Sequence, residues 1–68
     1  MQFTSQYFSI IPVDTHRRDD HALDYMLKEY VHGEARAERS DAGLLTAVVP
    51  DHPAIVAKAQ KVIEAWAI

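Results

Sequence analysis

Hydrophobic and polar positions divide this 68-residue chain into segments of different period. The clearest is 53–68, PAIVAKAQKVIEAWAI, where apolar residues recur at helical spacing and predict one buried stripe. The stripe consists of Ile55, Ala59, Val62, Ile63 and Trp66, widened by Val56. Asp51 or His52 is placed to cap this helix, and Pro53 suits its first turn. The end of the segment, 66–68, is wholly apolar, so we expect it to dock on a sheet or on another chain.

The first apolar segment, 3–13, reads FTSQYFSIIPV and predicts a strand, because Phe, Thr, Tyr and Ile favour extended structure. Alternation places Tyr7, Ser9, Ile11 and Val13 on one face, and Phe8 and Ile10 on the other. Both faces are partly apolar, which predicts cover on both sides. Pro12 has no backbone N–H and therefore marks an edge strand or its end. We expect this edge to pair with its twin in a second subunit.

A polar stretch, 14–21, leads into a helical pattern that begins at Ala22. One helical face carries Leu23, Met26, Leu27, Tyr30 and Val31. The residues able to cap the helix start are Asp14, Thr15, Asp19 and Asp20. Gly33 is well placed to end the helix.

The segment 34–39 is compatible with two structures. A continued helix is one, since Glu, Ala and Arg are good helix formers. A hairpin is the other, because Ser40-Asp41-Ala42-Gly43 has the composition of a tight turn. We prefer the hairpin, in which Ala35 and Ala37 face the core.

The following segment, 44–49, reads LLTAVV and predicts a strand in either case. It is almost continuously apolar, so we expect it to be the central strand. The predicted fold class is α+β: a single β-α-β-β-α domain, 1–68, with two helices packed on one face of a three-stranded sheet.

The small size of the chain limits how it is stabilised. A domain of this length buries only about 60% of the surface that its unfolded chain exposes. Cysteine is absent, which excludes disulfides and fits a reducing compartment. Stability must then come from packing, metal or oligomerisation. Because 49% of the residues are apolar, we expect a homodimer.

Charge and hydropathy narrow the classes of partner. The net charge is −3 and the isoelectric point about 5.7, so nucleic acid is an unfavourable partner and an anionic membrane surface is disfavoured. No apolar run approaches the roughly 20 residues that span a bilayer. The first residues, MQFT, lack the basic region of a signal peptide, and we expect a cytoplasmic protein.

The densest polar stretch, 14–24, reads DTHRRDDHALD and contains residue types that bind metals. His16 and His21 are the candidate ligands, with His32 or His52 needed to complete a site. No metal-binding spacing motif is present. The simpler interpretation is a solvated helix start in which Arg17 or Arg18 pairs with Asp20 or Asp24. We therefore assign no metal and no cofactor.

Catalytic signatures are also missing from the sequence. The chain has no cysteine, its serines lie in no nucleophile motif, and its two glycines form no phosphate loop. His52 is the best single candidate for acid–base chemistry, because backbone N–H groups at a helix start can hold an anion. Its simpler role is that of a cap, so we assign no catalytic residue.

These observations favour a small acidic protein-binding module: an adaptor, inhibitor or regulator that occludes or bridges a partner protein with a basic surface. The candidate partner-binding residues are Asp19, Asp20, Asp24, Tyr25 and Trp66. An alternative is a homo-oligomeric small-molecule-binding protein or enzyme with a shared His/Asp/Arg site. A DNA-binding regulator using a dimer strand or Arg36–Arg39 is a third class, and the net charge argues against it.

Overall fold

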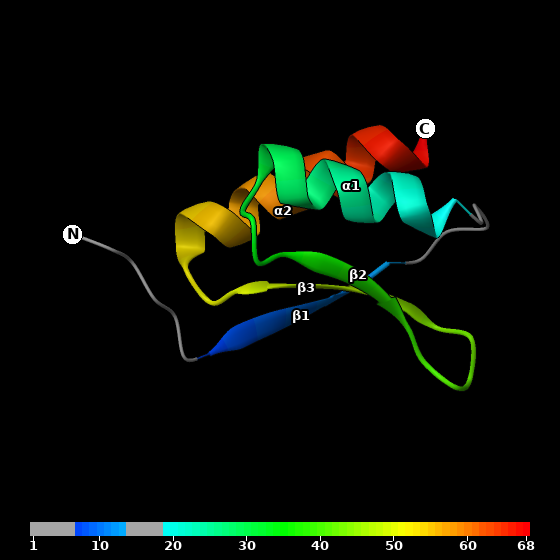
Figure 1. The fold of residues 1–68 in the computed structure, drawn as a ribbon. Helices are drawn as coiled ribbons and strands as arrows, with labels where there is room; N and C mark the ends of the chain where they lie inside the picture. The colour runs from blue at the N-terminus through cyan, green and yellow to red at the C-terminus, as the bar shows by residue number, and fades with distance from the viewer. Residues whose placement is uncertain (1–6, 14–18) are drawn as a thin grey trace.

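A computed structural model describes residues 7–13 and 19–68. The elements are β1 (Phe8–Pro12), α1 (Asp20–Tyr30), β2 (Arg36–Arg39), β3 (Leu45–Pro50) and α2 (Pro53–Ala67). The strands form an antiparallel sheet in the order β1-β3-β2, and both helices cover the same face of it (Figure 1). The predicted α+β fold and its β-α-β-β-α order are confirmed. The start of the predicted first strand, 3–6, lies outside the described residues.

The hairpin predicted for 34–49 is present, and β3 is the central strand. Its turn is closed by hydrogen bonds from the Gly43 N–H to the Ser40 carbonyl (2.9 Å) and from the Ser40 N–H to the Leu44 carbonyl (2.8 Å). Gly43 has a φ of 86°, a conformation that a residue with a Cβ adopts only under strain. Ala35 is buried and Ala37 partly buried against the core, as predicted.

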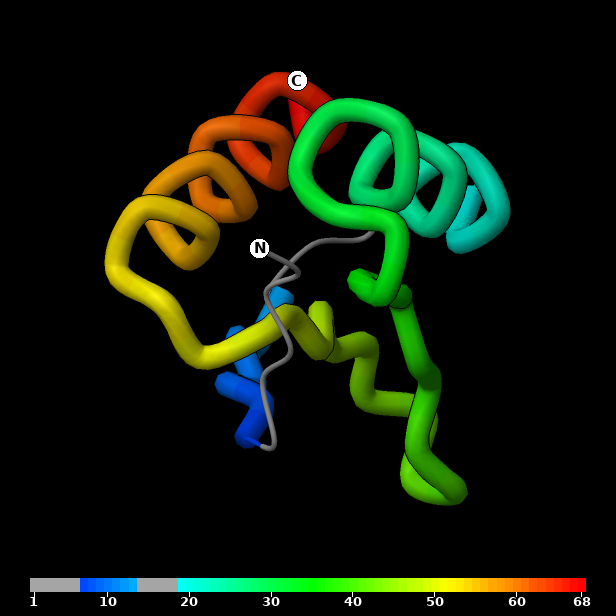
Figure 2. The backbone as a smooth tube through the Cα atoms, turned by 60° about the vertical axis from the view of Figure 1, so that its left-hand side comes forward, coloured from blue at the N-terminus to red at the C-terminus, as the bar shows by residue number. Residues whose placement is uncertain are grey.

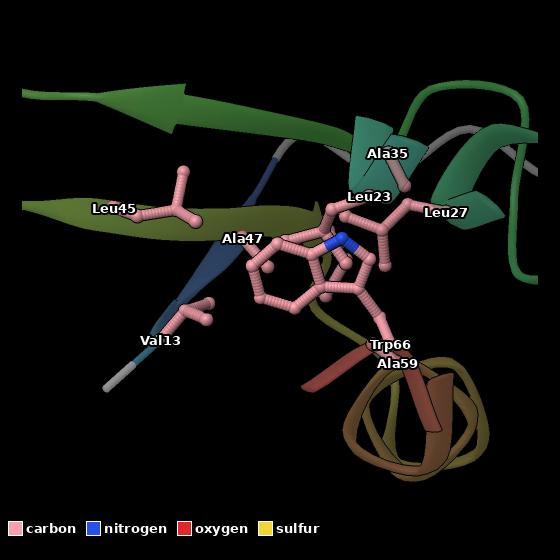
Figure 3. Packing of buried hydrophobic residues seen from close by; sticks show 9 residues of the cluster. Val13, Leu23, Leu27, Ala35, Leu45, Ala47, Ala59 and Trp66 are labelled. Atoms are coloured by element: carbon pink, nitrogen blue, oxygen red, sulfur yellow. The ribbon is translucent and has the colours of Figure 1, made fainter. Parts of the chain in front are cut away.

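The core lies between the sheet and the two helices. Its buried members are Val13, Leu23, Leu27, Ala35, Leu45, Ala47, Val49, Ala59 and Trp66. Figure 3 shows the Trp66 indole lying among side chains of α1 and the sheet. The indole is only 3% exposed, and its Nε1–H donates to the Asp19 carbonyl at 3.1 Å. This contact ties the end of α2 to the start of α1. Figure 1 shows these two helix ends on the same side of the molecule, and Figure 2 shows the two helices together above the sheet.

Two expectations from periodicity fail at helix ends. Tyr30, predicted on the core face, ends α1 with an exposed side chain. Ile68 follows α2 with a side chain that is 96% exposed, so within this chain only Trp66 of the apolar end is docked. Periodicity gives the angle of a side chain about its helix axis, but it does not tell whether another element lies opposite.

Candidate functional site

The acidic start of α1, predicted to bind a partner, makes contacts within the chain. Asp19 is the N-cap, and its carboxylate accepts the Ala22 N–H at 3.1 Å. Asp20 binds the Arg39 guanidinium through both carboxylate oxygens, at 2.6 and 2.8 Å. The hydrogen bond from Arg39 holds the pKa of Asp20 below its usual value. These two aspartates therefore order the helix start and join α1 to β2.

Asp24 joins the same two elements one turn later. Its Oδ1 accepts the backbone N–H of Ala37 in β2 at 2.9 Å, and Lys28 binds both carboxylate oxygens at 2.7 Å. Burial raises the pKa of Asp24, but the hydrogen bonds from Lys28 and Ala37 outweigh burial, and the pKa is lowered. The partners proposed for these aspartates, Arg17 and Arg18, lie outside the described residues.

The two predicted aromatic contact residues differ in accessibility. Tyr25 is exposed on α1, and its hydroxyl donates to the Glu29 carboxylate at 3.2 Å, so the side chain lies along its own helix. The negative charge of Glu29 raises the pKa of Tyr25. Trp66 belongs to the core, where its indole serves packing and is not part of the surface.

The three histidines that the structure describes, His21, His32 and His52, lie in different parts of the fold. His16 lies outside the described residues, and His21 is exposed on α1. The Nδ1 of His32 accepts the Glu34 N–H, and the Nδ1 of His52 accepts the Ala54 N–H. His52 is therefore the N-cap of α2, one of the two residues predicted for that position. Within residues 7–13 and 19–68, no group of three His, Asp or Glu side chains is arranged to hold a metal ion.

One face of the sheet is turned away from both helices (Figure 1), and it carries a second set of exposed side chains. We call this the outer sheet face. Strand alternation assigns three groups of residues to it: from β1, Phe8, Ile10 and Pro12; from β3, Thr46 and Val48, with Leu44 just before the strand; and from β2, Arg36 and Glu38. Ile10 and Leu44 are each 67% exposed, and Phe8 is partly exposed. Large apolar side chains therefore face solvent on one side of the sheet.

The β2 side of the outer sheet face is charged. The Nε of Arg36 binds the Glu38 carboxylate at 3.1 Å. The guanidinium of Arg36 also lies over the Phe8 ring, 5.6 Å from its centroid, although β3 separates the two strands. The Arg36 side chain thus crosses β3, where its register partner Val48 is buried. The accessible apolar surface is thereby concentrated along β1 and at Leu44.

An open hollow of about 330 Å³ adjoins this surface where β1 ends and β3 begins. Its lining consists of Pro12, Val13, Leu44, Leu45 and Thr46. Thr46 carries the polar side-chain group among these residues, and its hydroxyl donates to the Glu38 carbonyl at 3.3 Å. Among the lining residues there is thus no set of convergent polar groups of the kind that orients a small substrate.

The outer sheet face was not predicted as a binding site. Its signal was present in the sequence: both faces of the first strand are partly apolar, and 2–13 contains no charged residue. Comparisons of the chain with protein-family models, with curated proteins and with solved structures find no match. No helix in the described ranges is long and apolar enough to cross a membrane.

Proposed function

We propose that this protein is a small acidic protein-binding module, an adaptor, inhibitor or regulator, whose outer sheet face occludes or bridges a partner protein. The observation that carries the proposal is a row of exposed apolar residues on a sheet face that neither helix covers. Phe8, Ile10 and Pro12 follow one another along β1, and Leu44 lies near Pro12 at the end of that row. Scattered exposed apolar residues are normal, whereas apolar residues adjoining on one face indicate an interaction surface.

The arrangement of the face supports a protein as the ligand. It combines aliphatic and aromatic side chains with the Arg36–Glu38 ion pair at its border, and protein interfaces commonly have an apolar centre with a polar rim. The adjoining hollow offers room for an apolar side chain of the partner. The net charge of −3 favours a partner of basic character, because opposite charges speed encounter.

The acidic residues of α1 contribute less to this surface than the sequence suggested. Asp20 and Asp24 are occupied by Arg39 and Lys28, and these contacts offset their charge locally. Their main effect is to hold α1 against β2, so the proposal assigns partner contact to the sheet.

The proposal is tested by photo-cross-linking in the cells that produce the protein. A benzoylphenylalanine is placed at Leu44 on the outer sheet face, or at Gln60, which is exposed on α2, as the matched control. The expected result is an adduct with one defined second protein from position 44, its absence from position 60, and its loss when Ile10→Asp is added. No adduct at position 44, equal adducts from both positions, or an adduct with the same chain alone would overturn the proposal.

A further inference from the structure

The two edges of the sheet differ in their free backbone groups. In β1, the Tyr7 carbonyl accepts the Asp51 N–H, and the Val13 N–H donates to the Leu45 carbonyl, both at 3.0 Å. In an antiparallel pair, only alternate residues of a strand exchange backbone hydrogen bonds with a given neighbour. The backbone groups of the odd-numbered residues of β1 therefore bond to β3, and those of the even-numbered residues point to the open edge. The N–H and C=O groups of Phe8 and Ile10 therefore point outward, and they have no hydrogen-bond partner among residues 7–13 and 19–68.

The opposite edge is protected. The Ser40 N–H donates to the Leu44 carbonyl, which shows that the even-numbered residues of β2 form the backbone hydrogen bonds to β3. The N–H of the odd-numbered Ala37 therefore points outward, where the carboxylate of Asp24 accepts it at 2.9 Å. The strand itself carries Arg36, Glu38 and Arg39. Charged side chains and covered donors are the usual means of preventing edge-to-edge pairing. The β1 edge carries no charged side chain, since 2–13 contains no charged residue, and among the described residues no group accepts the outward N–H groups of Phe8 and Ile10.

We propose that a second copy of this chain pairs with the open edge of β1, antiparallel, about a two-fold axis at Ser9. In this register, Phe8 lies opposite Ile10 of the partner subunit, and the two residues exchange both of their N–H and C=O groups. The same exchange occurs on the other side of the axis. Every outward backbone group of Phe8 and Ile10 is then satisfied, and Pro12, which has no N–H to donate, lies outside these central pairs.

The side chains fit the same register. On the outer sheet face, Phe8 lies beside Ile10 of the partner subunit, an aromatic–aliphatic pair of the kind that stabilises sheets. On the helix side, Tyr7, which is 71% exposed, lies beside Ile11 of the partner subunit. Ser9 lies at the axis, where opposed backbones approach most closely, and its small side chain already donates to Asp51 at 2.9 Å.

Because β1 has no charged residue, a second copy of the same strand can pair with its open edge without charge repulsion between the two strands. A two-fold axis brings each residue near its own counterpart, so a charged strand would repel itself. This strand carries no charged residue, and the Asp51 carboxylate that accepts from Ser9 belongs to the turn after β3. Two three-stranded sheets would join into one sheet of six strands, three from each copy, with all helices on one face. The two outer sheet faces remain open and become continuous, so the dimer is compatible with partner binding and does not depend on it.

Sedimentation equilibrium of the full chain, with two matched variants, tests the proposal. Ile10→Lys introduces a charge beside the axis, and Thr46→Lys introduces the same charge on the same face in the central strand. We expect the wild type and Thr46→Lys to dimerise alike, and Ile10→Lys to raise the dimer dissociation constant by at least about tenfold, a change of 1.4 kcal/mol. Intrinsic fluorescence of the buried Trp66 verifies that each variant is folded.

Hydrogen exchange gives a second readout at single residues. In the wild-type dimer, we expect the Phe8 amide to exchange at least about tenfold more slowly than in Ile10→Lys, while the Ile11 amide, bonded to β3, changes little. A monomeric wild type, or dimers of all three proteins with equal affinity, overturns the proposal. Equal loss of dimer in both variants also overturns it, because that result indicates packing of the outer sheet faces against each other.

Discussion

The hydrogen bond from the Ala37 N–H to the Asp24 carboxylate allows the stability loss on removing Asp24 to be predicted quantitatively. Asp24→Ala removes a carboxylate that accepts a partly buried backbone N–H at 2.9 Å and binds Lys28 at 2.7 Å. A hydrogen bond to a charged group contributes about 1.5–3 kcal/mol, whereas an exposed ion pair one helical turn apart contributes about 0.3–0.5 kcal/mol. We therefore expect Asp24→Ala to lower the free energy of unfolding by about 2 kcal/mol.

The size of the domain makes this loss easy to measure. At about 0.05–0.15 kcal/mol per residue, a chain of this length has a total stability of roughly 3–10 kcal/mol. Urea unfolding followed by the fluorescence of Trp66, the single tryptophan of the chain, gives the free energy directly. Asp24→Asn retains an acceptor for the Ala37 N–H without the charge, so its loss should be intermediate.

Lys28→Ala separates the two contributions, since it removes the ion pair and leaves the bond to Ala37. Its expected cost is about 0.5 kcal/mol or less. The reasoning is refuted if Asp24→Ala unfolds at the wild-type urea concentration, or if Lys28→Ala costs as much as Asp24→Ala. The second outcome would mean that the ion pair, and not the backbone contact, joins α1 to β2.

Two further predictions concern pH and the turn. The folded-state pKa values of Asp20 and Asp24 are lowered, so their contribution to the free energy of unfolding is complete above the unfolded pKa of about 3.9 and is lost as the pH falls below it through the folded values. The double variant Asp20→Asn, Asp24→Asn should therefore lose less stability than the wild type below pH 4, as measured by the urea midpoint at a series of pH values. An unchanged pH dependence would contradict the assignment of acid unfolding to these two carboxylates. Gly43→Ala should cost about 1 kcal/mol, because φ is 86° there while no neighbouring atom lies within 4 Å of the added Cβ. Gly33→Ala, with the same open space and no positive φ, should stay within about 0.5 kcal/mol of the wild type by thermal unfolding, and equal losses at both glycines would argue against backbone strain.

The sequence pattern predicted the order of elements because each local period was consistent with one structure. The helical stripe ending at Trp66, the turn before Gly43 and the nearly continuous apolar run of β3 each identify their element. The hairpin at 34–49 was the uncertain choice, since the propensities of Glu, Ala and Arg favour a helix. Pairing of β2 with β3, and the cap that Asp24 provides for Ala37, overcome that preference.

The candidate site was less predictable, because it depends on which surfaces the fold covers. Asp20 and Asp24 were predicted to bind a partner protein or to pair with Arg17 or Arg18. Their contacts with Arg39 and the Ala37 N–H were not predicted, since these groups lie on a strand 13 to 19 residues away. Tyr25, a predicted contact residue, is exposed. Trp66 was predicted both on the buried stripe and among the contact residues, and it is buried. The outer sheet face was missed because alternation alone does not reveal which face the helices take.

Local composition and periodicity were thus sufficient for the elements, their order and the central position of β3, because these depend on neighbours within one or two turns or on the length of an apolar run. That both helices pack on one face of the sheet was predicted from the sequence. Only the tertiary structure decided which face they cover, that α1 caps the β2 edge, and that β1 is left with exposed apolar side chains. These features depend on contacts between residues far apart in the chain, because packing of the helices on one face of the sheet leaves the other face exposed, and contact of α1 with the β2 edge leaves the β1 edge uncovered by the helices.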